Sequence, residues 1–178
     1  TYQSACLAAL DVEEEIGKKL YMVDSRSASI GTALLIRVAV KLRDAGVNVA
    51  DIAAACTEMS KYIKLTAVVG SLKYLKMGGR LSGAAAFAGT MLHITPVVSI
   101  EDGKVVVIGK TRGKKAAEKL MHDKLTKDGL SLTRDFMFGH INCSESLETF
   151  INKSLTYISE VNGNVGVSSI GCSVGTHV

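Results

Sequence analysis

The sequence lacks most of the residues and runs that mark membrane, secreted or metal-binding proteins. It has no tryptophan and one proline in 178 residues. No apolar run approaches the roughly 20 residues that a membrane-spanning helix needs, and no signal peptide opens the chain. The four cysteines lie far apart, without a Cys-x-x-Cys pair or a histidine at ligand spacing, so we expect buried free thiols and no metal site. These absences predict a soluble, cytoplasmic protein without stable membrane insertion.

What the chain does contain is enough apolar sequence for a core and a strong charge asymmetry. Apolar residues make up 47% of the chain, which excludes a disordered protein. The formal net charge is −2 over residues 1–60, +9 over 61–127 and −3 over 128–178. Such a basic band favours an anionic ligand, nucleic acid or an acidic protein face. Nucleic acid is disfavoured, because the band lacks interleaved aromatic residues and matches no recognition motif.

Residues 1–64 have the pattern of the remainder of a parallel α/β layer. The segments expected there are residues 1–15, 30–45 and 48–62 as helices and residues 19–24 as a short buried strand. Gly17 and Gly46 stop the first two helices, and Asn48 caps the third. Because the alternation of helix and strand is typical of parallel sheets, we expect a first α/β domain over residues 1–64.

From residue 65 the pattern changes to that of an α+β domain. The strands expected there are residues 66–69, 95–100, 105–108, 136–141 and 165–170, with helices at 71–77, 113–127 and 144–158. Glu101-Asp102-Gly103-Lys104 stands between two β-branched runs, which is a strong signal for an antiparallel hairpin. We therefore expect a second domain over residues 65–178, with a mixed, partly antiparallel sheet covered by helices.

The stretch from Lys76 to Leu92 brings two glycines, a cation and a hydroxyl together immediately before an apolar run of small side chains. Gly78-Gly79 can end one helix in left-handed conformations, and Ser82 can cap the next. The free backbone amides of that second helix and the guanidinium of Arg80 together suit a carboxylate or a phosphate. A plainer interpretation stays open, in which the glycines only end a helix and Arg80 points into water.

Several segments carry this corner and other motifs in a specific order and spacing. They are Tyr74–Ser82, Ile94–Val98 with its Glu101–Lys104 hairpin, Lys110–Ala116, Thr1–Ala5 and Val23–Ser29. Taken together, these segments resemble the DegV family of bacterial lipid-binding proteins, and the resemblance covers essentially the whole chain. It implies a two-domain protein that encloses one fatty acid between an α/β domain and an α+β domain.

The resemblance also implies a carrier and not an enzyme. Such a protein presents the acyl carboxylate to a separate fatty acid kinase, which makes an acyl phosphate, and the carrier itself needs no cofactor. The polar residues implied near the carboxylate and the kinase contact are Arg80, Arg112 and His177, with Ser82 beside Arg80. On plainer interpretations, Arg112 starts a solvated helix and His177 ends a strand.

An acyl chain needs a narrow apolar slot, and the expected helix over residues 84–92 is a candidate for one wall of it. The side chains proposed for this wall are Phe87, Met91, Leu92 and Ile94. The remaining histidines, His93, His122 and His140, are expected at the surface or in the core and not as ligands.

Two further expectations follow from the resemblance. The family's architecture resembles the substrate-binding subunit of dihydroxyacetone kinase, so an enzyme subunit acting on a small polar metabolite is the alternative, which the apolar 84–92 segment disfavours. The family pattern also has a region before Thr1 and a Gly-Pro-Gly after Val178. We therefore expect this chain to be a fragment that self-associates through uncovered apolar surface.

Overall fold

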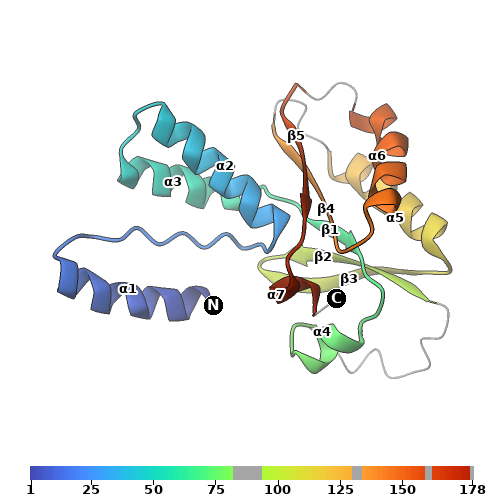
Figure 1. The fold of residues 1–178 in the computed structure, drawn as a ribbon, viewed down its shortest axis with the longest axis horizontal. Coiled ribbons are helices and arrows are strands. Elements are labelled where there is room, and N and C mark those ends of the chain that lie inside the picture. The colour runs from blue at the N-terminus through green and yellow to red at the C-terminus, as the bar shows by residue number, and fades with distance from the viewer. Residues whose placement is uncertain (82–93, 130–133, 159–161, 177–178) are drawn as a thin grey trace.

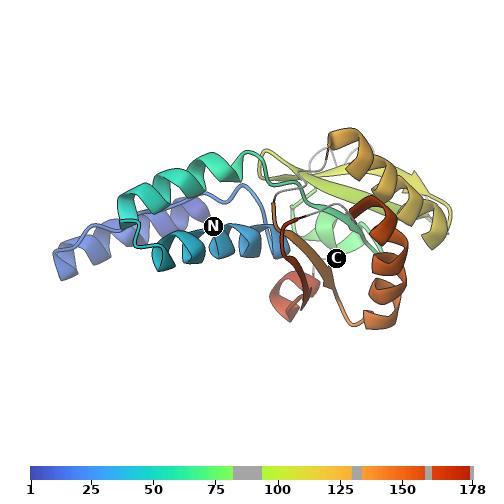
Figure 2. The same ribbon diagram turned by 90° about the horizontal axis from the view of Figure 1, so that it is seen from above.

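A computed structural model describes residues 1–81, 94–129, 134–158 and 162–176 (Figure 1). Its elements in chain order are α1 (Tyr2–Ile16), α2 (Ile30–Asp44), α3 (Val49–Ser60), β1 (Thr66–Val68), α4 (Lys73–Met77), β2 (Thr95–Glu101), β3 (Lys104–Thr111), α5 (Lys114–Asp128), β4 (Phe136–His140), α6 (Ser144–Ile158), β5 (Val165–Ser169) and α7 (Cys172–Gly175). Figures 1 and 2 show α1, α2 and α3 on one side of the molecule, and the strands with α4 to α7 on the other.

The ends of the first three helices confirm the sequence prediction to within two residues. Gly17 and Gly46 adopt left-handed φ angles of +62° and +79° after α1 and α2, which a residue with a side chain rarely adopts. Asn48 caps α3, since its side chain accepts a hydrogen bond from the backbone N–H of Asp51 at 3.0 Å. These ends depend on neighbouring residues only, so they could be predicted.

The strand expected over residues 19–24 is wrong. This segment connects α1 to α2 without joining a strand ladder in any part of the chain that the structure describes. A strand needs hydrogen bonds to a neighbouring strand, and an apolar run does not supply that neighbour. The fold class, mixed α/β with antiparallel and parallel strands, is confirmed, but the parallel pairing lies between β4 and β5 and not in residues 1–64.

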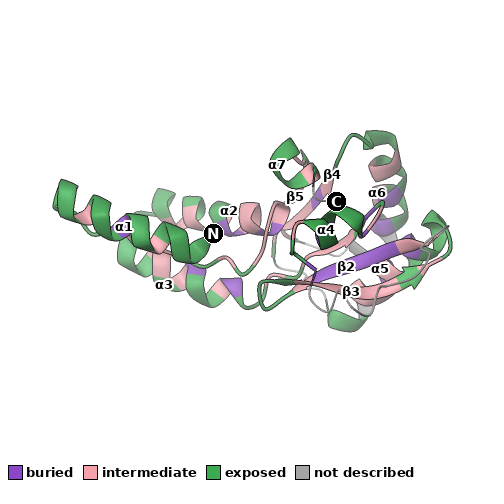
Figure 3. Ribbon diagram, turned by 90° about the horizontal axis from the view of Figure 1, so that it is seen from below, coloured by how far each residue is buried: buried purple, intermediate pink, exposed green. Residues whose placement is uncertain are grey.

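The sheet β1–β2–β3 is antiparallel, and its last two strands form the predicted hairpin. Asp102 and Gly103 make the turn with φ angles of +50° and +74°, as a tight two-residue hairpin turn requires. β2 is the central strand, and Figure 3 shows buried residues along it. The side chains that form the core between this sheet and α4 are Val69, Leu72, Leu75, Leu81 and Val98.

The second sheet contains β4 and β5, which pair in parallel from Phe136↔Val165 to His140↔Ser169. Helices α5 and α6 lie on the side of the molecule away from α1–α3 (Figure 2). Phe138 of β4 and Phe150 of α6 are the buried centre of a second core cluster. Their rings meet edge to face with centroids 6.2 Å apart.

Candidate functional site

The corner after α4 is described as far as Leu81, and the predicted Ser82 cap and the helix after it lie outside the described residues. Gly79 is left-handed at φ +67°, whereas Gly78 is right-handed at φ −77°, so only one of the two glycines is needed for its conformation. Arg80 is exposed, and its guanidinium donates a hydrogen bond to the carbonyl oxygen of Gly78. Leu81 is 6% exposed and bridges to Val105 of β3. A buried leucine thus holds an exposed arginine beside the turn end of the hairpin.

The structure does not bring Arg80 and Arg112 to the same end of β3. Arg80 precedes the bridge to Val105, near the start of β3, while Arg112 follows Thr111 at the end of that strand. The strand from Val105 to Thr111 spans roughly 20 Å. Arg112 is exposed, one residue before the N-cap of α5. The two guanidinium groups therefore project from backbone positions at opposite ends of one strand.

Of the residues proposed for the slot wall, Ile94 is the one that the structure describes. It is half-buried and leads into β2 at the end of the sheet where Arg112 lies. At this end the hydroxyl of Thr111 donates to the carbonyl oxygen of Thr95 at 3.0 Å. The proposed site residues that lie outside the described residues are Ser82, Phe87, Met91, Leu92 and His177.

The segment that leads to His177 starts at the carboxyl end of the parallel strands. The N–H of Ile170 donates to the carbonyl oxygen of His140 at 2.8 Å, and a Cβ on Gly175 would lie 3.4 Å from Ile141, so α7 packs against the end of β4. In the view of Figure 1, α7 and α4 both lie below the sheets. Ligand sites in parallel sheets commonly form beyond the carboxyl ends of the strands.

Two open apolar grooves lie in residues 1–64, and sequence analysis did not single them out. One has a volume of about 610 Å³ and follows α1, with Cys6, Leu7, Leu10, Leu20 and Met22 among its lining residues. The other has a volume of about 260 Å³ and lies between α2, α3 and the segment that connects α1 to α2. Its lining residues include Val23, Leu35, Ile36, Ile52 and Cys56. The larger volume is in the range of small-molecule sites. The sequence did contain a signal for the groove along α1, because this helix carries large apolar residues such as Leu7 and Leu10.

Of the three histidines expected at the surface or in the core, His122 is buried, His140 is half-buried and His93 lies outside the described residues. His122 is 8% exposed, stacks on Phe150 with ring centroids 4.7 Å apart, and has its Nε2 2.7 Å from the hydroxyl of Ser154. Burial lowers the pKa of His122 below its ordinary value, because the charged ring would lose its hydration. His140 accepts a hydrogen bond from the N–H of Cys143 through Nδ1 at 3.3 Å.

The thiols are free, but not all of them are buried. Cys56 is buried and Cys6 is half-buried, whereas Cys143 and Cys172 are exposed at the starts of α6 and α7. The expectation of four buried thiols is therefore wrong, because Cys143 and Cys172 lie at exposed positions where α6 and α7 begin. Within the described ranges, no group of three potential ligands could hold a metal ion. None of the helices described is long and apolar enough to cross a bilayer.

The basic band is partly neutralised by the fold. Along α5, lysines pair with carboxylates one turn later: Lys114 with Glu118 at 4.0 Å, Lys119 with Asp123 at 2.8 Å and Lys124 with Asp128 at 3.2 Å. Glu118 also meets Lys153 of α6 at 2.8 Å. The excess of cations counted along the sequence is thus not displayed as a uniform basic face on α5.

Comparison with known proteins agrees with the resemblance. A family model described as "Uncharacterised protein, DegV family" matches residues 1–178. The chain is 31% identical over 178 residues to a DegV domain-containing protein of Caldanaerobacter subterraneus, in an alignment that covers 99% of this chain and 62% of that protein. The chain therefore spans less than two thirds of the length of this relative.

Solved structures share the fold. DegV from Bacillus subtilis, described as a fatty acid binding protein, superposes with a TM-score of 0.81 at 25% identity, over 99% of this chain and 62% of that chain. The Fatty Acid Kinase (Fak) B3 protein of Streptococcus pneumoniae, loaded with linoleic acid, superposes with a TM-score of 0.85 at 22% identity, over 99% and 62% of the two chains. At that lower identity the match concerns the fold alone.

Proposed function

The chain belongs to the DegV family, and on this premise we propose that it binds a long-chain fatty acid and presents the acyl carboxylate to a separate fatty acid kinase. The kinase forms the acyl phosphate, and the chain itself is a cytoplasmic carrier without a cofactor. The observation that carries the proposal is the similarity, along nearly the whole chain, to the fatty acid binding DegV protein of B. subtilis.

The apolar grooves support a lipid ligand over a polar one. Burying one methylene group contributes about 0.8 kcal/mol, so an acyl chain is held mainly by the apolar area that it covers. The grooves along α1 and between α2 and α3 are lined mostly by apolar side chains. A small polar metabolite, as a dihydroxyacetone-kinase-like subunit would bind, needs converging donors and acceptors instead. The acyl slot in this proposal lies between a first domain, residues 1–64, and a second, residues 65–178.

The polar roles remain proposals for individual residues. Arg80, which follows α4, and His177, which follows α7, would act near the carboxylate and the kinase contact, as the family resemblance implies. Ser82 would support Arg80, and Arg112, at the other end of β3, would contribute to the kinase-facing surface. The proposed slot wall consists of Phe87, Met91, Leu92 and Ile94. Cations near a transferring phosphoryl group stabilise its charge.

Denaturing extraction of the purified protein, followed by mass spectrometry, tests the lipid ligand. We expect one predominant class of long-chain fatty acid to be released. Extraction that yields a bound triose and no fatty acid would support the enzyme subunit and reject the carrier.

Replacement of Arg80 tests the second half of the proposal. Arg80→Ala should reduce acyl phosphate formation by the kinase much more than it reduces fatty acid retention, because the guanidinium is exposed beside Gly78 and lines neither of the two grooves described above. Lys76→Ala, another exposed cation on α4, is the matched control and should change neither. Loss of lipid in step with loss of activity would make Arg80 a lipid ligand and contradict the proposed role.

A further inference from the structure

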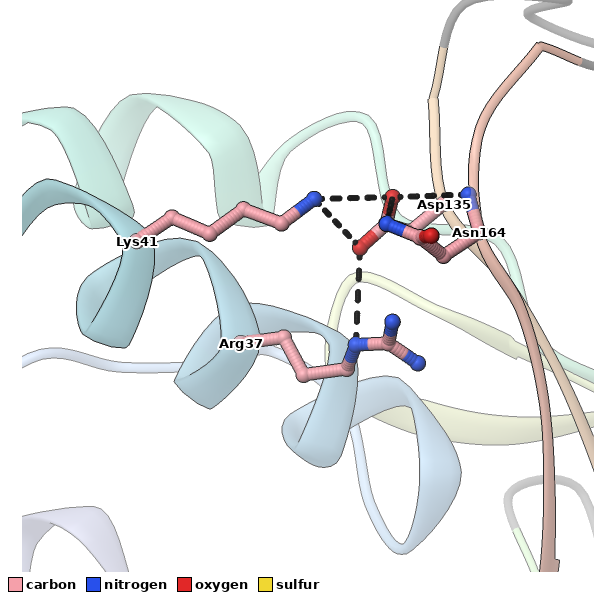
Figure 4. A network of polar contacts seen from close by, with 4 residues as sticks. All are labelled: Arg37, Lys41, Asp135 and Asn164. Carbon is pink, nitrogen blue, oxygen red and sulfur yellow. Dashed lines mark hydrogen bonds and ion pairs between the residues drawn. The ribbon is translucent and has the colours of Figure 1, made fainter.

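Asp135, the residue before β4, receives two cations from α2 (Figure 4). The ammonium group of Lys41 lies 3.0 Å from Oδ1 and 2.9 Å from Oδ2 of the Asp135 carboxylate. Nε of Arg37, one turn earlier on the same face of α2, lies 3.4 Å from Oδ2. These contacts join residues 1–64 to the start of the parallel sheet.

The carboxylate is held from the other side by the start of β5. The backbone N–H of Asn164 donates to Oδ1 of Asp135 at 3.1 Å, and its side-chain amide lies 3.4 Å from the same oxygen. A Cβ at position 163 would lie 1.9 Å from the carbonyl oxygen of Arg134, so only glycine allows the segment before β5 to approach the segment before β4 this closely. We refer to Arg37, Lys41, Asp135 and Asn164 as the Asp135 cluster.

The Asp135 carboxylate is the most buried charge of the cluster. Its side chain is 14% exposed, against 34% for Arg37 and 55% for Lys41. Burial alone would raise the pKa of Asp135, but the hydrogen bonds from Lys41 and Asn164 and the charges of Lys41 and Arg37 outweigh it and lower that pKa. The carboxylate is thus ionised at neutral pH, and removal of its cations would leave a largely buried charge unpaired.

Two other contacts hold the start of α2. Gly139 of β4 lacks a side chain where Ile30 packs, since a Cβ there would lie 2.8 Å from Ile30 Cγ2. Arg26, just before α2, forms an ion pair with Asp102 in the hairpin turn, with side chains that are 39% and 85% exposed. The ionic contact at Asp135 is more buried than the ion pair between Arg26 and Asp102. It is therefore the stronger candidate for fixing α2.

We propose that Asp135 is a positioning residue, which holds α2 against the β4–β5 sheet and thereby fixes the α2 wall of an apolar groove that can hold an acyl chain. This inference rests on the proposed fatty acid binding. α2 also supplies Leu35, Ile36 and Ala39 to the groove that it shares with α3. A shift of α2 therefore moves an apolar wall of this groove, and a wider groove covers less of an acyl chain and releases it faster.

The test is a double-mutant cycle on release of a fluorescent long-chain fatty acid from the full chain. Asp135→Asn keeps the shape and removes the charge, and should speed release by about tenfold, because the two cations of α2 then lose their partner and no longer hold the helix against the sheet. Lys41→Met should act in the same direction. The double variant should release lipid little faster than Asp135→Asn alone, since the two side chains act through each other.

The matched control is Asp123→Asn, which breaks a 2.8 Å ion pair to Lys119 within α5 and touches no part of α2. It should leave release unchanged. Amide hydrogen exchange across residues 30–44 is the second readout, and it should accelerate in Asp135→Asn and not in the control. If Asp135→Asn does not fold, the release rate and the hydrogen exchange are both measured on Lys41→Met, which lies at a more exposed position.

The outcomes separate the two proposals. Additive effects in the cycle, or an unchanged release rate with a lower stability, would overturn the positioning role while leaving fatty acid binding intact. If extraction shows that the unmodified protein holds no fatty acid, the proposed function fails, and hydrogen exchange alone decides whether Asp135 holds α2. Unchanged exchange over residues 30–44 would then reject that role as well.

Discussion

Residues 1–64 and residues 65–176 bury their apolar side chains to very different extents. Both core clusters lie in the second region, where Leu72 and Leu75 are 2% and 4% exposed. In the first region, Leu7 and Leu10 of α1 are 68% and 62% exposed, and Figure 3 shows α1 largely as exposed surface. Both regions contain well-formed helices with sequence-encoded ends. The difference shows that a helix can form without being buried. The backbone hydrogen bonds of a helix are made within the helix, whereas its apolar face is buried only against a second surface.

This contrast has a functional meaning in the proposed carrier. Contiguous exposed apolar surface on a globular protein commonly marks a ligand groove or a protein contact. In this molecule such surface is concentrated on the helices of residues 1–64, next to both grooves. The second region supplies the stable core, and the first supplies surface that a ligand or a partner can cover.

The largest effect is expected from the same substitution made in each region. Leu72→Ala should lower the free energy of unfolding by about 2–5 kcal/mol, because it opens a cavity beside Leu75 and Val98. Leu10→Ala, at an exposed site on α1, should change it by less than about 0.5 kcal/mol. Urea unfolding followed by far-UV circular dichroism measures both. Equal losses would mean that α1 is covered in solution and would contradict the difference in burial between the two regions.

The next effect concerns self-association, which we expect of this chain because Leu7 and Leu10 expose an apolar face on α1. Leu10→Lys should weaken association by about tenfold, since a charge in an apolar contact is desolvated without a partner. Met77→Lys, at a 73% exposed site on α4, serves as the control and should leave association unchanged. Sedimentation equilibrium gives the constants. If the unmodified chain stays monomeric at high concentration, the prediction of self-association is wrong.

A pH effect of intermediate size is expected in the second region only. The pKa of His122 is lowered by burial in the fold, so between its ordinary value and the lowered one the unfolded chain binds a proton that the native chain does not. Stability should therefore be full above the ordinary histidine pKa of about 6.5 and should fall as the pH drops below it. Urea midpoints at pH 7.5 and 5.5 measure the loss. His122→Gln should show a smaller difference between the two pH values, and an equal difference would assign the effect to other groups.

The smallest effect is expected at the exposed contact between the regions. Arg26→Ala removes the ion pair to Asp102, whose side chains are 39% and 85% exposed, and should cost less than about 1 kcal/mol. The loss should vanish at high salt, because exposed charges are screened. Urea midpoints at low and high salt provide the measurement. A large, salt-independent loss would show that the hairpin turn holds α2 as firmly as the Asp135 cluster does.

The sequence by itself determined the features that depend on residues close together in the chain. Gly17 and Gly46 end helices by their backbone preference, Asn48 starts one with its side chain, and Asp102-Gly103 makes a hairpin turn that few other residue pairs favour. The order and spacing of the motifs also identified the family, which the match over residues 1–178 confirms. Each of these signals is local or a matter of residue order, so no knowledge of the packed structure was needed.

Only the tertiary structure decided which of these elements meet. The segment 19–24 has strand composition but no strand partner among the described residues, and Arg80 and Arg112, both basic motif residues, lie at opposite ends of β3. Lys41 and Asp135 form their contact across 94 positions of sequence, and neither residue has a local pattern that predicts it. The physical reason is that pairing and burial depend on surfaces brought together by the whole fold, whereas backbone preferences act over a few residues.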